Sequence, residues 1–158
     1  MSDVIEKVVV LKAPLIKVWN AISDATQLGA WFGAEFDAPF EAGKPVKGRI
    51  VPTRMDPEIA KFQEPHRGME MTWEIVAIEK PTRFAYRWHP GPVDATIDYS
   101  KEPTTLVEFR LEEVPGGTKL TITESGFERI DVARRAAVKH GNSEGWAAQT
   151  RLIAKYVE

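Results

Sequence analysis

The feature that most constrains the fold is a run of alternating apolar and polar residues at positions 106–126. The alternation covers residues 107–112 and 119–124, on either side of the sequence Pro115-Gly116-Gly117. Period-two alternation places one side of a strand on a core and the other in water. The two glycines provide the positive-φ positions that a tight turn needs. The run therefore predicts an antiparallel hairpin, around which the rest of the chain is organised.

One residue of this hairpin breaks the pattern. Glu124 is in register with Leu120 and Ile122, on the side that is otherwise apolar. A carboxylate that faces a core is costly unless it is paired, hydrogen-bonded or neutralised. Tyr86, Trp88 or a buried arginine is expected to satisfy it. The alternative is that the strand twists outward at its end and leaves Glu124 in water.

Length and composition limit the function classes. A chain of 158 residues with 43% hydrophobic and 28% charged residues is predicted to form one soluble domain over residues 1–158. The net charge of −2 gives no reason to expect nucleic acid or an anionic membrane as a partner. No apolar run reaches the ~18 residues of a membrane span. The absence of cysteine excludes thiolate catalysis and cysteine–zinc sites, and favours a cytoplasmic location.

Helices are predicted near both ends of the chain. Apolar residues spaced three and four apart predict a helix over residues 15–22, and Ser23-Asp24 begins a second helix that Gly33 ends. Near the C-terminus, Asp131 is expected to cap a short helix over residues 132–139. Gly141 is expected to end it, and a long last helix then begins at residue 142 or 143, with Trp146 on its buried side.

Strands fill the region between these helices. They are predicted at residues 4–12, 34–38, 46–51, 71–76 and 84–88, followed by the hairpin. Residues 52–68 and 89–103 are rich in proline and predicted as long loops. Consecutive strands with segregated helices predict an α+β fold with an antiparallel sheet, one side charged and the other covered by the long helix. Since connections alternate between the ends of such a sheet, the two long loops should share one end and form the entrance to a pocket near Met71 and Trp88.

The sequence resembles the START-like (SRPBCC, helix-grip) superfamily, and within it the homologue family of the activator of heat-shock-protein-90 ATPase. The resemblance rests on segments spread along nearly the whole chain. It implies a curved antiparallel sheet of six to seven strands wrapped on a long C-terminal helix, with two short helices after the first strand and a cavity inside. The segments are Ala13-Pro14 with Val18-Trp19, Ala30-Trp31-Phe32-Gly33, residues 81–88, residues 116–118 and 124–127, and Glu144-Gly145-Trp146.

The candidate ligand-binding residues are the inward aromatic side chains together with Glu124. Rings that line a cavity and rings that fill a core are alike in sequence, but tryptophan and tyrosine carry polar tips that suit a partly wet pocket. The three histidines, at positions 66, 89 and 140, are scattered, so no metal site and no cofactor are predicted. The predicted site residues are Trp31, Phe32, Met71, Trp73, Tyr86, Trp88, Phe109 and Glu124.

The function predicted from these features is binding of a hydrophobic or aromatic small molecule between sheet and C-terminal helix, by a monomer or weak dimer, without assured catalysis. The first alternative is a co-chaperone-like adaptor or stress-related protein that acts through its surface, with a chaperone as partner. The second is a cyclase- or hydrolase-type enzyme. Such an enzyme needs positioned acid and base groups, and Glu124 with His89 is the only candidate pair.

Overall fold

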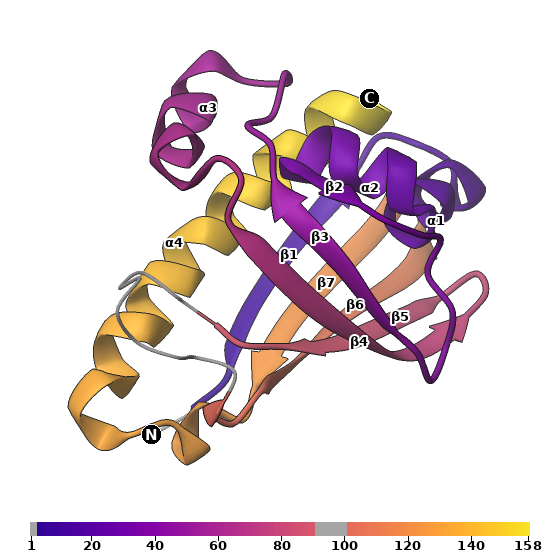
Figure 1. Ribbon diagram of the computed structural model, residues 1–158. Coiled ribbons are helices and arrows are strands. Elements are labelled where there is room, and N and C mark those ends of the chain that lie inside the picture. The colour runs from indigo at the N-terminus through magenta and orange to yellow at the C-terminus, as the bar shows by residue number, and fades with distance from the viewer. Residues whose placement is uncertain (1–2, 91–100) are drawn as a thin grey trace.

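The protein is an α+β domain in which a seven-stranded antiparallel sheet curves around a long C-terminal helix (Figure 1). The computed structural model describes residues 3–90 and 101–158. The strand order is β1-β7-β6-β5-β4-β3-β2, which leaves β1 and β2 at the edges. The strands are β1 Ile5–Leu11, β2 Ala34–Phe36, β3 Pro45–Ile50, β4 Glu70–Glu79, β5 Arg83–Trp88, β6 Thr105–Val114 and β7 Gly117–Ser125.

The predicted hairpin is formed by β6 and β7. Its register pairs Phe109 with Ile122 and Leu111 with Leu120, so that these side chains share the buried side of the sheet. Gly116 has a φ of 86°, the left-handed conformation that the tight turn requires. The alternation in sequence therefore predicted both strands and their inward residues correctly.

Helices α1 (Leu15–Ser23) and α2 (Ala25–Phe32) follow β1, as the sequence predicted. The side chain of Asp24 caps α2 by accepting from the backbone N–H of Thr26 at 3.0 Å, and Gly33 ends the helix with a φ of 97°. The indole of Trp31 donates to the carbonyl of Ala21 at 2.9 Å. This bond joins the two helices and fixes the position of Phe32 at the end of α2.

The prediction that residues 52–68 form a plain loop is wrong. They contain helix α3 (Pro57–Gln63) and the short 3-10 helix η1 (Glu64–His66). Asp56 caps α3 by accepting from the N–H groups of Glu58 and Ile59 at 2.9 and 3.2 Å, and Pro57 occupies the first turn. Proline is favoured there because its missing N–H would have no partner in any case. The prolines taken as loop signals thus include a helix start.

The predicted break in the C-terminal helical region is also wrong. Helix α4 runs without interruption from Val132 to Val157, with Asp131 as its cap, as expected, and Gly141 inside it. Packing of Val138, Trp146 and Ile153 against the core compensates for the weak helix propensity of glycine. Trp146 is only 2% exposed, so its predicted burial is confirmed.

The two glycines of α4 lead to a prediction about stability. A Cβ atom added at Gly141 or Gly145 would meet no other atom within 4 Å. Gly141→Ala and Gly145→Ala are therefore each expected to raise the free energy of unfolding by up to about 1 kcal/mol, the difference in helix propensity. Urea denaturation measures this change. A loss of stability in either variant would show that the glycine is required by contacts that the structure does not contain.

The second predicted long loop, residues 89–103, falls mostly outside the described residues. Within the described part of the chain, no helix is long and apolar enough to cross a membrane.

Candidate functional site

Glu124 lies at the centre of the candidate site, one residue before the C-terminal end of β7. It is fully buried, and its carboxylate accepts hydrogen bonds from four side chains. Trp88 Nε1 (2.7 Å), Thr105 Oγ1 (2.6 Å) and Asn142 Nδ2 (3.1 Å) donate to Oε2, while Trp146 Nε1 (2.8 Å) and Asn142 Nδ2 (2.9 Å) donate to Oε1. The predicted inward position of Glu124 is therefore confirmed.

The donors around Glu124 are all electrically neutral. They come from β5, β6 and two successive turns of α4, so a single carboxylate ties the helix to the sheet. Of the expected partners, Trp88 bonds to it, but Tyr86 and arginine do not in the described part of the chain. Hydrogen bonds from neutral donors can hold a buried carboxylate without a counter-ion. Because these donors already occupy both oxygens, the geometry gives Glu124 no free position from which to act as a general base.

Tyr86 and Trp73 form a layer behind this network. Their rings stack with centroids 3.8 Å apart and an interplanar angle of 3°, and both residues are fully buried. Tyr86 Oη and Trp73 Nε1 have no hydrogen-bond partner among the described residues. Burial raises the pKa of Tyr86 well above its usual value, and the charge of Glu124 raises it further. The carboxylate therefore acts electrostatically on the groups around it.

The predicted aromatic residues do come together, and they pack against one another. Phe32 lies edge-on to Trp73 and Trp146, with centroid distances of 5.4 and 6.1 Å, and Trp88 lies 5.7 Å from Trp146. Phe109 contacts Trp146 at 5.8 Å. The rings thus fill much of the interior between sheet and helix. Met71 is half-buried at the margin of this core, and Trp31 supports Phe32 from α2.

A small recess of about 90 Å³ remains beside these rings. The Nε2 group of Gln149 donates to the backbone carbonyl of Phe32 at 3.0 Å, whereas its Oε1 is buried and has no partner among the described residues. The recess therefore combines an apolar wall with one unused acceptor. It is lined by Phe32, Trp88, Gly141, Asn142, Gly145, Trp146 and Gln149.

A larger groove of about 550 Å³ lies next to the recess, between α3 and α4. Gly141 and Gly145 border both hollows, so a side chain at either position would extend into the space where the hollows adjoin. Phe62 is 81% exposed at the edge of the groove, and Ile59 is buried there. The rest of its lining is Asp56, Glu58, Glu144, Ala147, Ala148 and Arg151.

The sequence did not reveal most of this opening. The sequence pattern predicts that Gly141 ends a short helix and that the last helix begins at residue 142 or 143, and it places Phe62 in a loop. Trp88, which was named in the predicted entrance, lines the recess, and the α3 side of the groove belongs to residues 52–68, one of the two predicted loops. The entrance itself stays a prediction. Met71 does not line the recess or the groove. The signal that could have found the opening is the spacing of four between Gly141 and Gly145, which puts both on one side of a helix.

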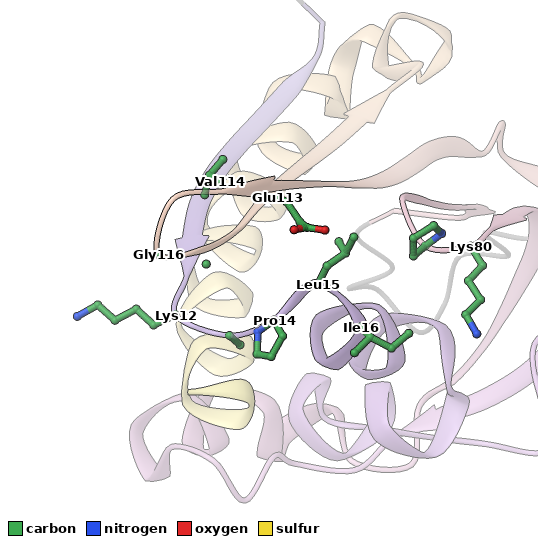
Figure 2. A pocket seen from close by; sticks show the side chains of 11 residues that line it. Lys12, Pro14, Leu15, Ile16, Lys80, Glu113, Val114 and Gly116 are labelled. Atoms are coloured by element: carbon green, nitrogen blue, oxygen red, sulfur yellow. The ribbon is translucent and has the colours of Figure 1, made fainter.

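A third hollow, of about 960 Å³, lies at the other end of the sheet (Figure 2). The connections at Lys80-Pro81 and Gly116-Gly117 both line it, which confirms that the two short connections emerge at the same end. Figure 2 shows Lys12 and Lys80 extending away from the hollow, with Leu15 and Pro14 facing it. Figure 2 also shows the carboxylate of Glu113, which lines this hollow, beside Leu15.

The histidines do not form a metal site in the described part of the chain, where no group of three or more histidine, aspartate or glutamate side chains could hold a metal ion. His89 does not hydrogen-bond to Glu124 there. The candidate catalytic pair is therefore not assembled in this structure.

Comparison with known proteins places the chain in context. The model of the family described as "Activator of Hsp90 ATPase homolog 1-like protein" matches residues 12–158. A search of curated proteins found no match.

Several solved structures share the fold at low sequence identity. Protein CV1439 from Chromobacterium violaceum has a TM-score of 0.72 and 18% identity, with 100% of this chain and 99% of that chain covered. Protein MLL2253 from Mesorhizobium loti has a TM-score of 0.69 and 20% identity, covering 97% and 95%. The Aha1 dimer from Colwellia psychrerythraea has a TM-score of 0.67 and 15% identity, covering 98% and 96%. At these identities the similarity establishes the fold alone.

Proposed function

The chain belongs to the family of activator of Hsp90 ATPase homolog 1-like proteins, and from that premise we propose that it binds a small hydrophobic or aromatic molecule between its sheet and helix α4. The observation that carries the proposal is the recess beside Phe32, Trp88 and Trp146, which shares two lining glycines with the α3–α4 groove. Ligand sites are typically apolar hollows with a few fixed polar groups. This recess has that character.

The size of the hollows determines how a ligand would sit. A volume of about 90 Å³ is smaller than the roughly 150 Å³ of a cavity known to accept benzene. The ligand is therefore expected to place one ring or chain end in the recess and the rest in the groove of about 550 Å³. Phe32 and Trp88 would contact it directly, while Trp73, Tyr86 and Phe109 would form the layer behind them.

Glu124 has a positioning role in this proposal. Its carboxylate holds the indole N–H groups of Trp88 and Trp146, and thereby fixes two walls of the recess. Trp31 and Met71, the remaining predicted site residues, would support the site through packing. A preorganised pocket binds more tightly because less side-chain freedom is lost on binding.

A role with a chaperone rests on the family description and stays a prediction, and so does a dimeric state, which is described for the Colwellia relative. Native mass spectrometry of freshly purified protein tests the proposal most directly, by detecting a small molecule that co-purifies.

Gly145→Leu tests the position of the site. A leucine there would extend into the space where recess and groove adjoin, and is expected to weaken binding of a neutral probe, 2-naphthylmethanol, by about tenfold, equal to 1.4 kcal/mol. The Cβ of the leucine would meet no atom within 4 Å, and leucine is a better helix former than glycine, so urea denaturation is expected to show that the variant is folded. Calorimetric titration measures the affinity.

Ala136→Leu is the matched control, since it adds a leucine to an exposed position of α4 outside both hollows. Its affinity for the probe should equal that of the unmodified protein. Unchanged binding in Gly145→Leu would exclude this entrance.

A further inference from the structure

Among the polar side chains that line the recess, the donor nitrogens have hydrogen-bond partners and one acceptor has none. The indole N–H groups of Trp88 and Trp146 and the side-chain N–H₂ of Asn142 all donate to Glu124. The N–H₂ of Gln149 donates to the carbonyl of Phe32. Each of these donor nitrogen atoms therefore has at least one acceptor, although the Gln149 amide carries a second N–H. Of the polar side-chain atoms that line the recess, Gln149 Oε1 is buried without a partner in the described part of the chain, and it is an acceptor.

The charge nearest to the recess is negative. Glu124 lies directly behind its indole walls, and no cationic side chain pairs with it among the described residues. Its field is strong enough to raise the pKa of neighbouring Tyr86, beyond the larger effect of burial. In a low-dielectric interior such a charge favours cations and disfavours anions over several ångströms.

The rim of the groove adds to this field. Three carboxylates, Asp56, Glu58 and Glu144, line it, against the single cation Arg151. Asp56 is paired with Lys155 at 2.7 Å, and Glu144 lies 3.3 Å from His140. After the pairing of Asp56, two carboxylates and one guanidinium remain, so a ligand that enters meets a slightly negative rim.

We propose that the molecule bound in this site is a small aromatic amine in its protonated form. This inference rests on the proposed function and assigns the chemical class of its ligand. The ammonium N–H would donate to Gln149 Oε1, and the charge would lie against the electron-rich rings of Trp88 and Trp146. A carboxylate ligand could accept from the second N–H of the Gln149 amide, but it would be repelled by the charge of Glu124.

Three probes that share one ring system test the class of ligand. They are 2-naphthylmethylammonium, 2-naphthylmethanol and 2-naphthoate, titrated calorimetrically into the full chain at neutral pH. The ammonium is expected to bind at least about tenfold more tightly than the carboxylate, with the alcohol between them. Binding of the ammonium should weaken with salt, because part of the attraction is exposed to solvent.

Two variants separate the contribution of the Gln149 acceptor from that of the negative rim. Gln149→Met removes the acceptor, while the carbonyl of Phe32 keeps the hydrogen bond from Gln63 at 3.0 Å. It should reduce the preference for the ammonium over the carboxylate. Glu58→Gln, at an exposed rim position, should weaken binding of the ammonium probe by about two- to fivefold. The affinity for the alcohol probe should stay the same. A merely structural effect would lower the affinity for both probes equally.

The outcomes distinguish this inference from the function on which it rests. If none of the three probes binds, the proposed function fails and the ligand class with it. If the carboxylate binds as tightly as the ammonium, and Gly145→Leu still blocks both, the proposed function stands and the ligand class is wrong. An unchanged preference in Gln149→Met and Glu58→Gln together would also overturn the assignment.

Discussion

Replacing Glu124 with glutamine is expected to lower the free energy of unfolding by about 3–5 kcal/mol. Glutamine has the same shape, but one carboxylate oxygen becomes an N–H₂ group that faces existing donors. The indoles of Trp88 and Trp146 and the hydroxyl of Thr105 all need an acceptor at this point. At least one buried donor is then left unpaired, and the charge that strengthened the other bonds is lost. Urea denaturation followed by circular dichroism measures the change.

The matched control for this substitution is Glu112→Gln. Glu112 lies on β6, the strand next to Glu124, and its side chain is exposed. Its effect should stay within about 0.5 kcal/mol, as for most surface substitutions. If Glu124→Gln costs less than about 1 kcal/mol, the carboxylate does not hold α4 to the sheet.

The position of Glu124 could be predicted from sequence, but its partners could not. Period-two alternation places it inward together with Leu120 and Ile122, and the structure agrees. Trp146 and Asn142 reach it from a helix, where the relation between residue number and direction depends on helix phase and docking. The predicted break at Gly141 also separated Asn142 from its correct place inside one helix. The local sequence pattern therefore identified Glu124 as a buried acceptor, whereas its donors on α4 depend on how that helix packs against the sheet.

The two helical errors have a common cause. Helix propensity alone predicts that proline at position 57 and glycine at position 141 interrupt a helix. Pro57 sits where α3 begins, with Asp56 as cap, and Gly141 is held in α4 by the buried residues on either side. Tertiary context therefore overrode local preference at both positions, and the opening between α3 and α4 could not be predicted without those helices.

The inward placement of the aromatic residues was predicted more fully than the partners of Glu124. Strand periodicity placed Trp73, Tyr86 and Phe109 inward, and all three are buried. What the sequence left open was whether these rings line a cavity or fill a core. The short ring-to-ring distances show that most of them pack on one another, and the recess lies on the side of these rings near α4.

Trp146→Ala is expected to lower the free energy of unfolding by about 3–5 kcal/mol, as large aromatic truncations in cores do. Trp146 is 2% exposed and contacts Phe32, Trp88 and Phe109. The substitution leaves a cavity and takes one donor from Glu124. Phe62→Ala on α3 is the control, because Phe62 is 81% exposed and its removal should cost less than about 0.5 kcal/mol.

Trp146→Phe separates packing from hydrogen bonding. It keeps an aromatic ring but removes the N–H that donates to Glu124 at 2.8 Å, so it should cost about 1–3 kcal/mol. Combined with Glu124→Gln, the double variant should lose less stability than the sum of the two single variants, because both remove the same bond. Strict additivity would show that the indole and the carboxylate act independently. A loss below about 1 kcal/mol for Trp146→Ala would show that α4 is not anchored to the sheet through this residue.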